Sequence, residues 1–223
     1  MATQVGPPYP KNIPLLKGAL VTVDDTASTK TVVSFQYNPE TLSRTLRPQT
    51  VGAQDGNPSQ TLRYVGAPVQ TISLEVRIDA MEQLNSGDQT AIQQGIYPQL
   101  ATLEILLYPA SSVVESAQSN LAKGVIEIVP MTAPRTIFVW GPGRVVPVRL
   151  TSATVTEQLF DANLNPIQAS VALEMRVLSY SDVFSPNADY QLFLTYQKNL
   201  ETLSSSWLQK TTSVNIGIDA SKL

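Results

Sequence analysis

The chain of 223 residues contains no cysteine and no histidine. Without cysteine there can be no disulfide framework, no thiolate nucleophile and no thiolate metal site. Without histidine the chain lacks the usual acid–base group near neutral pH and the commonest metal ligand. These two absences exclude most hydrolytic triads and zinc sites, so we expect no enzymatic activity, no cofactor and no bound metal.

Charge is also scarce, since charged residues make up 15% of the chain against about 25% in typical globular proteins. Two explanations stay open: neighbouring molecules cover part of the surface, or the surface is rich in uncharged polar residues. The net charge is −3 and no run of five basic residues occurs. Nucleic-acid binding draws its affinity from lysine and arginine contacts with phosphates, so we expect no nucleic-acid partner.

No apolar run approaches the roughly 18 residues that a membrane-spanning helix needs, so we expect no membrane insertion. Prolines 7, 8, 10 and 14 interrupt the N-terminal region, which lacks the continuous apolar core of a signal peptide. We therefore expect synthesis in the cytoplasm without a signal peptide. The same prolines disfavour helix and central strand, so residues 1–17 are predicted to be a proline-rich arm.

Alternating apolar and polar residues, as in "QTISLEVRID", predict β-strands through most of residues 18–180. The predicted strands are 18–25, 31–40, 70–79, 125–130, 136–140, 145–160 and 168–180, with a Gly-Pro-Gly turn at 141–143 and a hairpin loop at 161–166. Residues 97–109 are predicted to be a helix in which Leu100, Leu103, Leu106 and Leu107 share one side. Residues 48–69 and 81–96 are predicted to be irregular, and 110–124 a polar loop with some helical character. The fold class is mainly β: an antiparallel β-barrel or sandwich with one flanking helix.

The last part of the chain, 181–223, is predicted to hold a helix at 185–207 followed by an extended tail. Apolar side chains recur along this helix at a spacing of three and four residues. They are Phe193, Tyr196, Leu200, Leu203 and Trp207. Their aromatic and leucine composition is typical of buried interfaces, so our hypothesis is that they bind a partner. Packing against the chain's own barrel is the open alternative.

Candidate chemical motifs are weak. "GPGRVV" (141–146) lacks a full phosphate-loop pattern and indicates a β-turn. The carboxylates of Asp24-Asp25 and of Asp79 with Glu82 follow no calcium-loop spacing and indicate solvated turns. Trp140 and Trp207 are candidates for a sugar-stacking platform, although core or interface positions suit their apolar surroundings better.

Three stretches, taken in order, resemble the tube-domain family of contractile injection systems, the phage-tail-like particles. The first is "VVSFQYNPETLSRTL", and the second is a strand ending in aspartate before a leucine-rich helix. The third runs from "IFVWGPG" through "LFDANLNPIQAS" to the last strand. The positions that match the family pattern are Phe35, Tyr37, Asn38, Pro39, Glu40, Asp79, Phe138, Trp140, Gly141, Phe160, Asp161, Pro166 and Ala169.

The resemblance implies a tail-tube type barrel over residues 18–180. The most similar members are baseplate adaptors, in which a LysM module follows the tube-like domain, whereas the segment after residue 180 is too short for one here. The function implied is that of a structural adaptor in an assembled injection particle. It would form a ring, six-fold as in the family, whose partners are copies of itself and inner tube, spike and baseplate proteins. Two alternatives stay open: a tube or tube-terminating subunit, and a stand-alone carbohydrate-binding β-sandwich.

Overall fold

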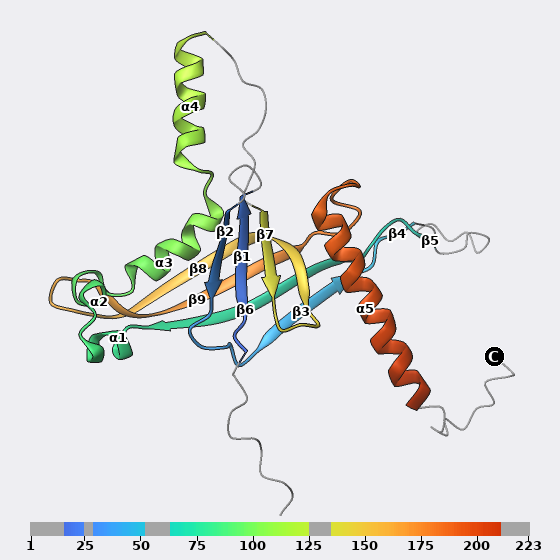
Figure 1. Ribbon diagram of the computed structural model, residues 1–223, viewed down its shortest axis with the longest axis horizontal. Helices are drawn as coiled ribbons and strands as arrows, with labels where there is room; N and C mark the ends of the chain where they lie inside the picture. Colours follow the sequence, from blue (N-terminus) through green and yellow to red (C-terminus); the bar gives the residue numbers. More distant parts are fainter. Residues whose placement is uncertain (1–15, 25–28, 52–62, 125–134, 211–223) are drawn as a thin grey trace, which may run out of the picture.

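The computed structural model describes residues 16–24, 29–51, 63–124 and 135–210. Seven antiparallel strands form one sheet in the order β2-β1-β7-β8-β9-β6-β3 (Figure 1). These strands are β1 (Ala19–Asp24), β2 (Thr29–Ser34), β3 (Leu42–Arg47), β6 (Val69–Asp79), β7 (Arg135–Val139), β8 (Val145–Phe160) and β9 (Pro166–Val177). A separate pair consists of β4 (Thr50–Val51) and β5 (Arg63–Tyr64). The predicted mainly β, antiparallel fold is confirmed. The predicted arm at 1–17 falls almost wholly outside the described residues, and the predicted strand at 125–130 does so completely.

The three long strands β6, β8 and β9 carry most of the core. Successive side chains of a strand point to opposite faces, so alternate residues share one environment. In β6 the side chains from Ile72 to Ile78 alternate between buried and exposed. β9 repeats the pattern opposite them, with Val171, Leu173 and Met175 at most 2% exposed. The apolar side that the alternation predicts is therefore the side that faces the core.

β8 is much longer than the strand that precedes it in the sheet. β7 pairs with β8 only from Val145 to Val148, whereas β9 accompanies β8 from Val148 to Phe160. A register shift between Leu150 and Ser152 marks a bulge, and bulges bend a strand and increase its twist. The second half of β8 thus extends past the end of β7.

The sheet curls so that β1, β2 and β7 cross over the inner face of the long strands (Figure 1). Leu20 of β1 and Phe138 of β7 are fully buried there. Gln36, which follows edge strand β2, connects it to the end of β6: its side-chain amide donates to the carbonyl of Asp79 at 2.8 Å and accepts from the N–H of Asp79 at 2.9 Å. A side-chain amide here makes the two bonds that a neighbouring strand would make.

Residues 81–96, predicted to be irregular, form two short helices instead. They are α1 (Met81–Ser86) and α2 (Gln89–Gln94). The side chain of Asp88 accepts from the backbone N–H groups of Thr90 and Ala91 and so caps the start of α2. Short helices without an apolar stripe leave little periodic signal, which is why the prediction missed them.

The predicted helix at 97–109 is confirmed as α3 (Tyr97–Glu104) followed by the 3₁₀ turn η1 (Ile105–Leu107). Leu100, Leu103 and Leu106 are buried, but Leu107 is 43% exposed, so its predicted place on the packed side is wrong. The tighter 3₁₀ winding places residues three apart on one side. Leu106 therefore continues the side of Leu103, and Leu107 turns outward.

Two further helices extend in opposite directions from the curled sheet, which we call the barrel (Figure 1). α4 (Ser111–Ala122) has no buried residue, and α5 (Ala188–Lys210) packs over β8 near its start and then projects away. The helix predicted at 185–207 is confirmed with slightly shifted bounds. Within the described part of the chain, no helix combines the length and apolarity needed to cross a membrane.

Candidate assembly surface

Strands β3, β6, β9 and β8 lie next to one another in the sheet, and the side of them that faces away from the core forms one continuous surface. Most of its side chains are polar, charged or as small as alanine, and Val69 at the start of β6 is an exception. The polar, charged and alanine side chains include Ser43, Thr45 and Arg47 of β3; Thr71, Ser73, Glu75 and Arg77 of β6; Gln168, Ser170, Ala172, Glu174 and Arg176 of β9; and Arg149, Ser152, Thr154, Thr156 and Gln158 of β8. We call this four-stranded surface the hydrophilic face. An antiparallel sheet with one packed and one solvated side has this pattern, and here it covers the full width of four strands.

Each border of the hydrophilic face is a strand edge that pairs with no further strand among the described residues. β3 ends the sheet, pairing only with β6 on one side. On the opposite border, residues 149–160 of β8 have β9 on one side and no described strand on the other. An open edge presents unpaired N–H and C=O groups, which can pair with a strand of another molecule. The face is therefore bounded by two edges that can accept a strand.

Two guanidinium groups near the edge strand β3 lie close enough to repel each other. Arg44 of β3 donates to the hydroxyl of Tyr196 on α5 at 3.1 Å. Burial lowers the pKa of Arg144, in the turn before β8, and the positive charge of Arg44 lowers it further. Within the described residues no carboxylate forms an ion pair with either arginine. The two arginines are 100 positions apart in the sequence, so no local pattern could have indicated this repulsion.

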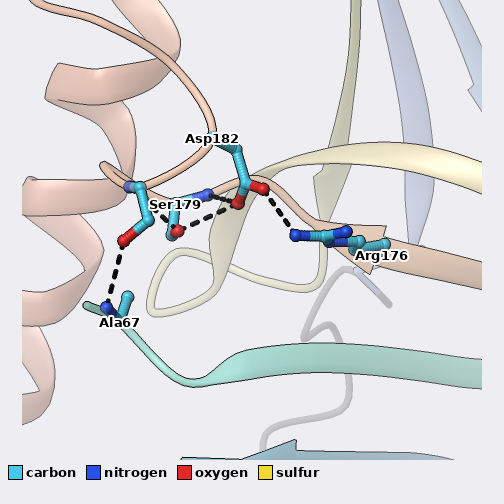
Figure 2. A network of polar contacts seen from close by, with 5 residues as sticks. Ala67, Arg176, Ser179 and Asp182 are labelled. Carbon is cyan, nitrogen blue, oxygen red and sulfur yellow. Dashed lines mark hydrogen bonds and ion pairs between the residues drawn. The ribbon is translucent and has the colours of Figure 1, made fainter. Parts of the chain in front are cut away.

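The base of α5 is held by two ion pairs. Arg135 of β7 donates to Asp189 in the first turn of α5 at 2.5 Å, and the Asp189 side chain is only 6% exposed. Figure 2 shows the second, between Arg176 of β9 and Asp182. Asp182 also accepts from the backbone N–H and the hydroxyl of Ser179. These contacts fix the segment that leads from β9 into α5, so α5 projects from a firmly anchored base.

The apolar stripe of α5 divides between two environments. Phe193 and Tyr196 are 6% and 4% exposed and belong to the core, with Phe193 edge-on to Tyr180. Leu200, Leu203 and Trp207 are 42%, 59% and 66% exposed. The structure therefore corrects the hypothesis for Phe193 and Tyr196, which stabilise the chain itself. The exposed half of the stripe (Leu200, Leu203 and Trp207), which we call the distal α5 stripe, stays a candidate for partner binding.

A second exposed apolar surface lies at the tip of the β8–β9 hairpin. Leu159, Phe160 and Leu164 are each more than half exposed. The loop beneath them is ordered by Asp161, which accepts from the N–H groups of Asn163 at 2.7 Å and Asn165 at 2.8 Å. The side chain of Asn165 donates to Asp161 as well, and these hydrogen bonds lower the pKa of the Asp161 carboxyl. The tip is thus pre-ordered for contact.

The amino-acid sequence matches one family of known proteins. The sequence model of the contractile injection system tube proteins matches residues 17–179, which is most of the chain. The chain belongs to the contractile injection system tube protein family. No curated protein matches it.

Two solved structures with detectable similarity are parts of assembled particles. One is the tail of an empty gene transfer agent particle with C6 symmetry, with 13% identity and a TM-score of 0.29, covering 72% of this chain and 90% of the other. Another is the six-fold symmetrised baseplate of the anti-feeding prophage, with 13% identity and a TM-score of 0.26, covering 75% and 93%.

The first family motif of this tube protein forms the turn between β2 and β3. Phe35 is 2% exposed and anchors the turn in the core. The side chain of Asn38 accepts from the N–H of Gly18 at 2.9 Å and donates to the carbonyl of Leu16 at 2.8 Å. Tyr37, Pro39 and Glu40 line a surface hollow of about 420 Å³ together with Asp79 of β6. The motif thus ties the start of β1 to the turn that leads into edge strand β3.

The second group of motif residues packs the end of β7. Phe138 and Trp140 stack with ring centroids 6.0 Å apart, and Gly141 takes the positive φ of 71° that its turn requires. A Cβ atom on Gly18 would lie 2.6 Å from the Trp140 ring. Trp140 therefore covers the backbone of the chain's own first strand, which favours the core interpretation over a sugar platform.

The remaining motif residues hold the end of the long strands near α2. Pro166 and Ala169 of β9 are buried, and the carbonyl of Pro166 accepts from Ile96 at 2.9 Å. Asp79 ends β6 and accepts from the N–H of Met81 at 2.6 Å. No group of three metal-ligating side chains occurs among the described residues. The side chain of Asp24 and all of Asp25 lie outside them.

Proposed function

We propose that this protein is a non-enzymatic ring subunit of an injection particle and serves as the adaptor between the inner tube and spike and the baseplate. The hydrophilic face with its two open edges is the observation that carries the proposal. A sheet edge left open in a single molecule is a liability unless it is covered or paired. Pairing β3 of one copy with residues 149–160 of β8 in the next satisfies both edges at once.

The strand count makes this pairing geometrically consistent. Each copy contributes four antiparallel strands, β8, β9, β6 and β3. Because four is even, β3 of one copy runs antiparallel to β8 of the next, so the same pattern continues around a closed ring. The hydrophilic face of every copy then lines the central channel. The expected ring is six-fold, which the family membership supports.

The distal α5 stripe favours an adaptor over a plain tube subunit. The ring pairing occupies the edges of the sheet, while α5 projects away from the barrel (Figure 1). Leu200 and Leu203 provide an apolar surface that ring formation does not need. A subunit joining a ring to a different component requires such an additional surface. The alternative, a tube or tube-terminating subunit, is supported by the apolar hairpin tip at Leu159, Phe160 and Leu164, which suits stacking on another ring.

Labelling the subunit in intact particles tests the proposal. The chain contains no histidine, so a C-terminal hexahistidine tag gives nickel–nanogold one defined site per copy. We expect electron micrographs to show gold at the spike and baseplate end. Gold along the whole tube would identify a tube subunit, and gold at the opposite end a tube-terminating subunit. Either result would contradict the adaptor role.

A further inference from the structure

The ring junction has a definite register that the residues of one copy specify. We infer that β3 pairs with β8 of the next copy so that Arg44 lies opposite Glu157. The inference rests on the proposed ring and names the contacts that form it. It follows from strand geometry, from the match of side chains on both faces, and from two charged groups that form no ion pair among the described residues of one copy.

Strand geometry limits the register to two choices. Within one copy Arg44 stands in the same row as Ile72, Met175 and Leu150. Closed barrels have strands tilted by about 35–45°, so each circuit of the sheet is staggered. With strands about 4.8 Å apart and about 3.3 Å per residue, four strands at this tilt shift the row by roughly four to six residues. The shift runs toward Phe160, because that end of β8 is unpaired by β7.

The two candidate partners of Arg44 are Val155 and Glu157. Val155 is opposite Val171, four positions from Met175 along β9, and Glu157 is opposite Ala169, six positions away. Both side chains lie on the core side of the sheet, as Arg44 does. Only the register with Arg44 opposite Glu157 brings opposite charges together.

The neighbours of Arg44 support the second register. With Arg44 opposite Glu157, Leu46 lies opposite Val155, and Leu46 is 50% exposed in the single copy. On the hydrophilic face, Thr45 lies opposite Thr156, a polar pair of similar size. With Arg44 opposite Val155, the carboxylate of Glu157 would instead lie opposite Leu42. Cross-strand pairs of opposite charge and of apolar side chains stabilise a sheet, and a charge facing an aliphatic side chain does not.

Electrostatics near β3 give an independent reason for a carboxylate. Arg44 and Arg144 repel each other, and that repulsion adds to burial in lowering the pKa of Arg144. In the part of the chain that is described, Glu157 has no ion-pair partner either, although its side chain is half-buried. A carboxylate from the next copy would offset the repulsion between the arginines. Arginine is well suited to such an interface because its planar fork matches a carboxylate.

Engineered cysteines test the register directly, because the natural chain has none. The variant Thr45→Cys/Thr156→Cys places a thiol pair directly across the inferred junction. The matched variant Thr45→Cys/Thr154→Cys does so for the alternative register. Within one copy these positions are separated by β6 and β9, which is about 14 Å and too far for an intramolecular disulfide. On mild oxidation we expect only the first variant to form disulfide-linked oligomers. The largest of them should contain as many subunits as one ring.

Charge exchange provides the second measurement. We expect Arg44→Glu and Glu157→Arg each to weaken ring assembly on the order of tenfold, and the double exchange to restore it, as for paired interface charges. Glu82→Arg, on the exposed side of α1, is the control and should assemble normally. Rings that cross-link through position 154 instead, or a double exchange without rescue, overturn the register while leaving the ring intact. Absence of both rings and cross-links contradicts the proposed function as well.

Discussion

The division of the α5 stripe leads to a prediction that separates folding from partner binding. Phe193→Ala removes a ring that is 6% exposed and lies 5.7 Å from Tyr180 and 6.2 Å from Tyr196, between centroids. Truncating a buried phenylalanine costs about 3–5 kcal/mol, because the lost burial and the remaining cavity both destabilise the fold. For a chain of this size about 2–4 °C accompanies each kcal/mol, so we expect the Tm to fall by roughly 6–20 °C.

The matched variant is Leu203→Ala, ten residues further along the same helix. Its side chain is 59% exposed, and exposed substitutions usually change stability by less than about 0.5 kcal/mol. We expect its Tm to stay within about 2 °C of the wild type, while its recovery in assembled particles falls.

Thermal melts of the purified proteins and quantitative blots of purified particles provide the two readouts. An unchanged Tm for Phe193→Ala would refute the placement of α5 on the barrel. A Tm several degrees lower for Leu203→Ala would show that the chain itself covers the distal α5 stripe. Normal particle recovery for Leu203→Ala would remove this leucine from the proposed contact.

Three further predictions concern the barrel. Gly18→Ala should destabilise the protein by about 1–3 kcal/mol, because the new Cβ would meet the Trp140 ring at 2.6 Å; Gly143→Ala, with open space around its Cβ, should leave urea denaturation unchanged. Hydrogen bonds lower the pKa of Asp161 in the folded state, so they stabilise the charged carboxylate. This stabilisation is complete at a pH above the pKa of about 3.9 in the unfolded chain. It is lost as the pH falls through the lower pKa of the folded state. Asp161→Asn should therefore be less stable than wild type at pH 6, with the difference shrinking at pH 3; a constant difference would contradict this. Asp189→Ala should cost about 3 kcal/mol in urea denaturation, because it removes the carboxylate that pairs with β7, and an effect below about 0.5 kcal/mol would show the pair to be weak.

Much of the sheet was predictable because its information is local. Alternation along β6 and β8 depends only on which side of a pleated strand meets the core, so even the bounds of β8, Val145–Phe160, agree with the pattern. The hairpin at 161–166 carries its own turn chemistry in Asp161 and Asn165. The family match likewise follows from residues in order along the chain.

The tertiary structure decided which parts of those patterns are covered. Phe193 and Leu203 stand on the same side of one helix, and only the distance that the barrel extends along α5 buries one and exposes the other. The repulsion between Arg44 and Arg144 and the contact of Arg44 with Tyr196 of α5 depend on how distant segments of the chain are brought together. The open edge of β8 depends on β7 pairing only with its first residues, and the edge of β3 depends on its place at the end of the sheet. Periodicity determines which side of an element is apolar, whereas long-range packing determines where along the element that side is covered.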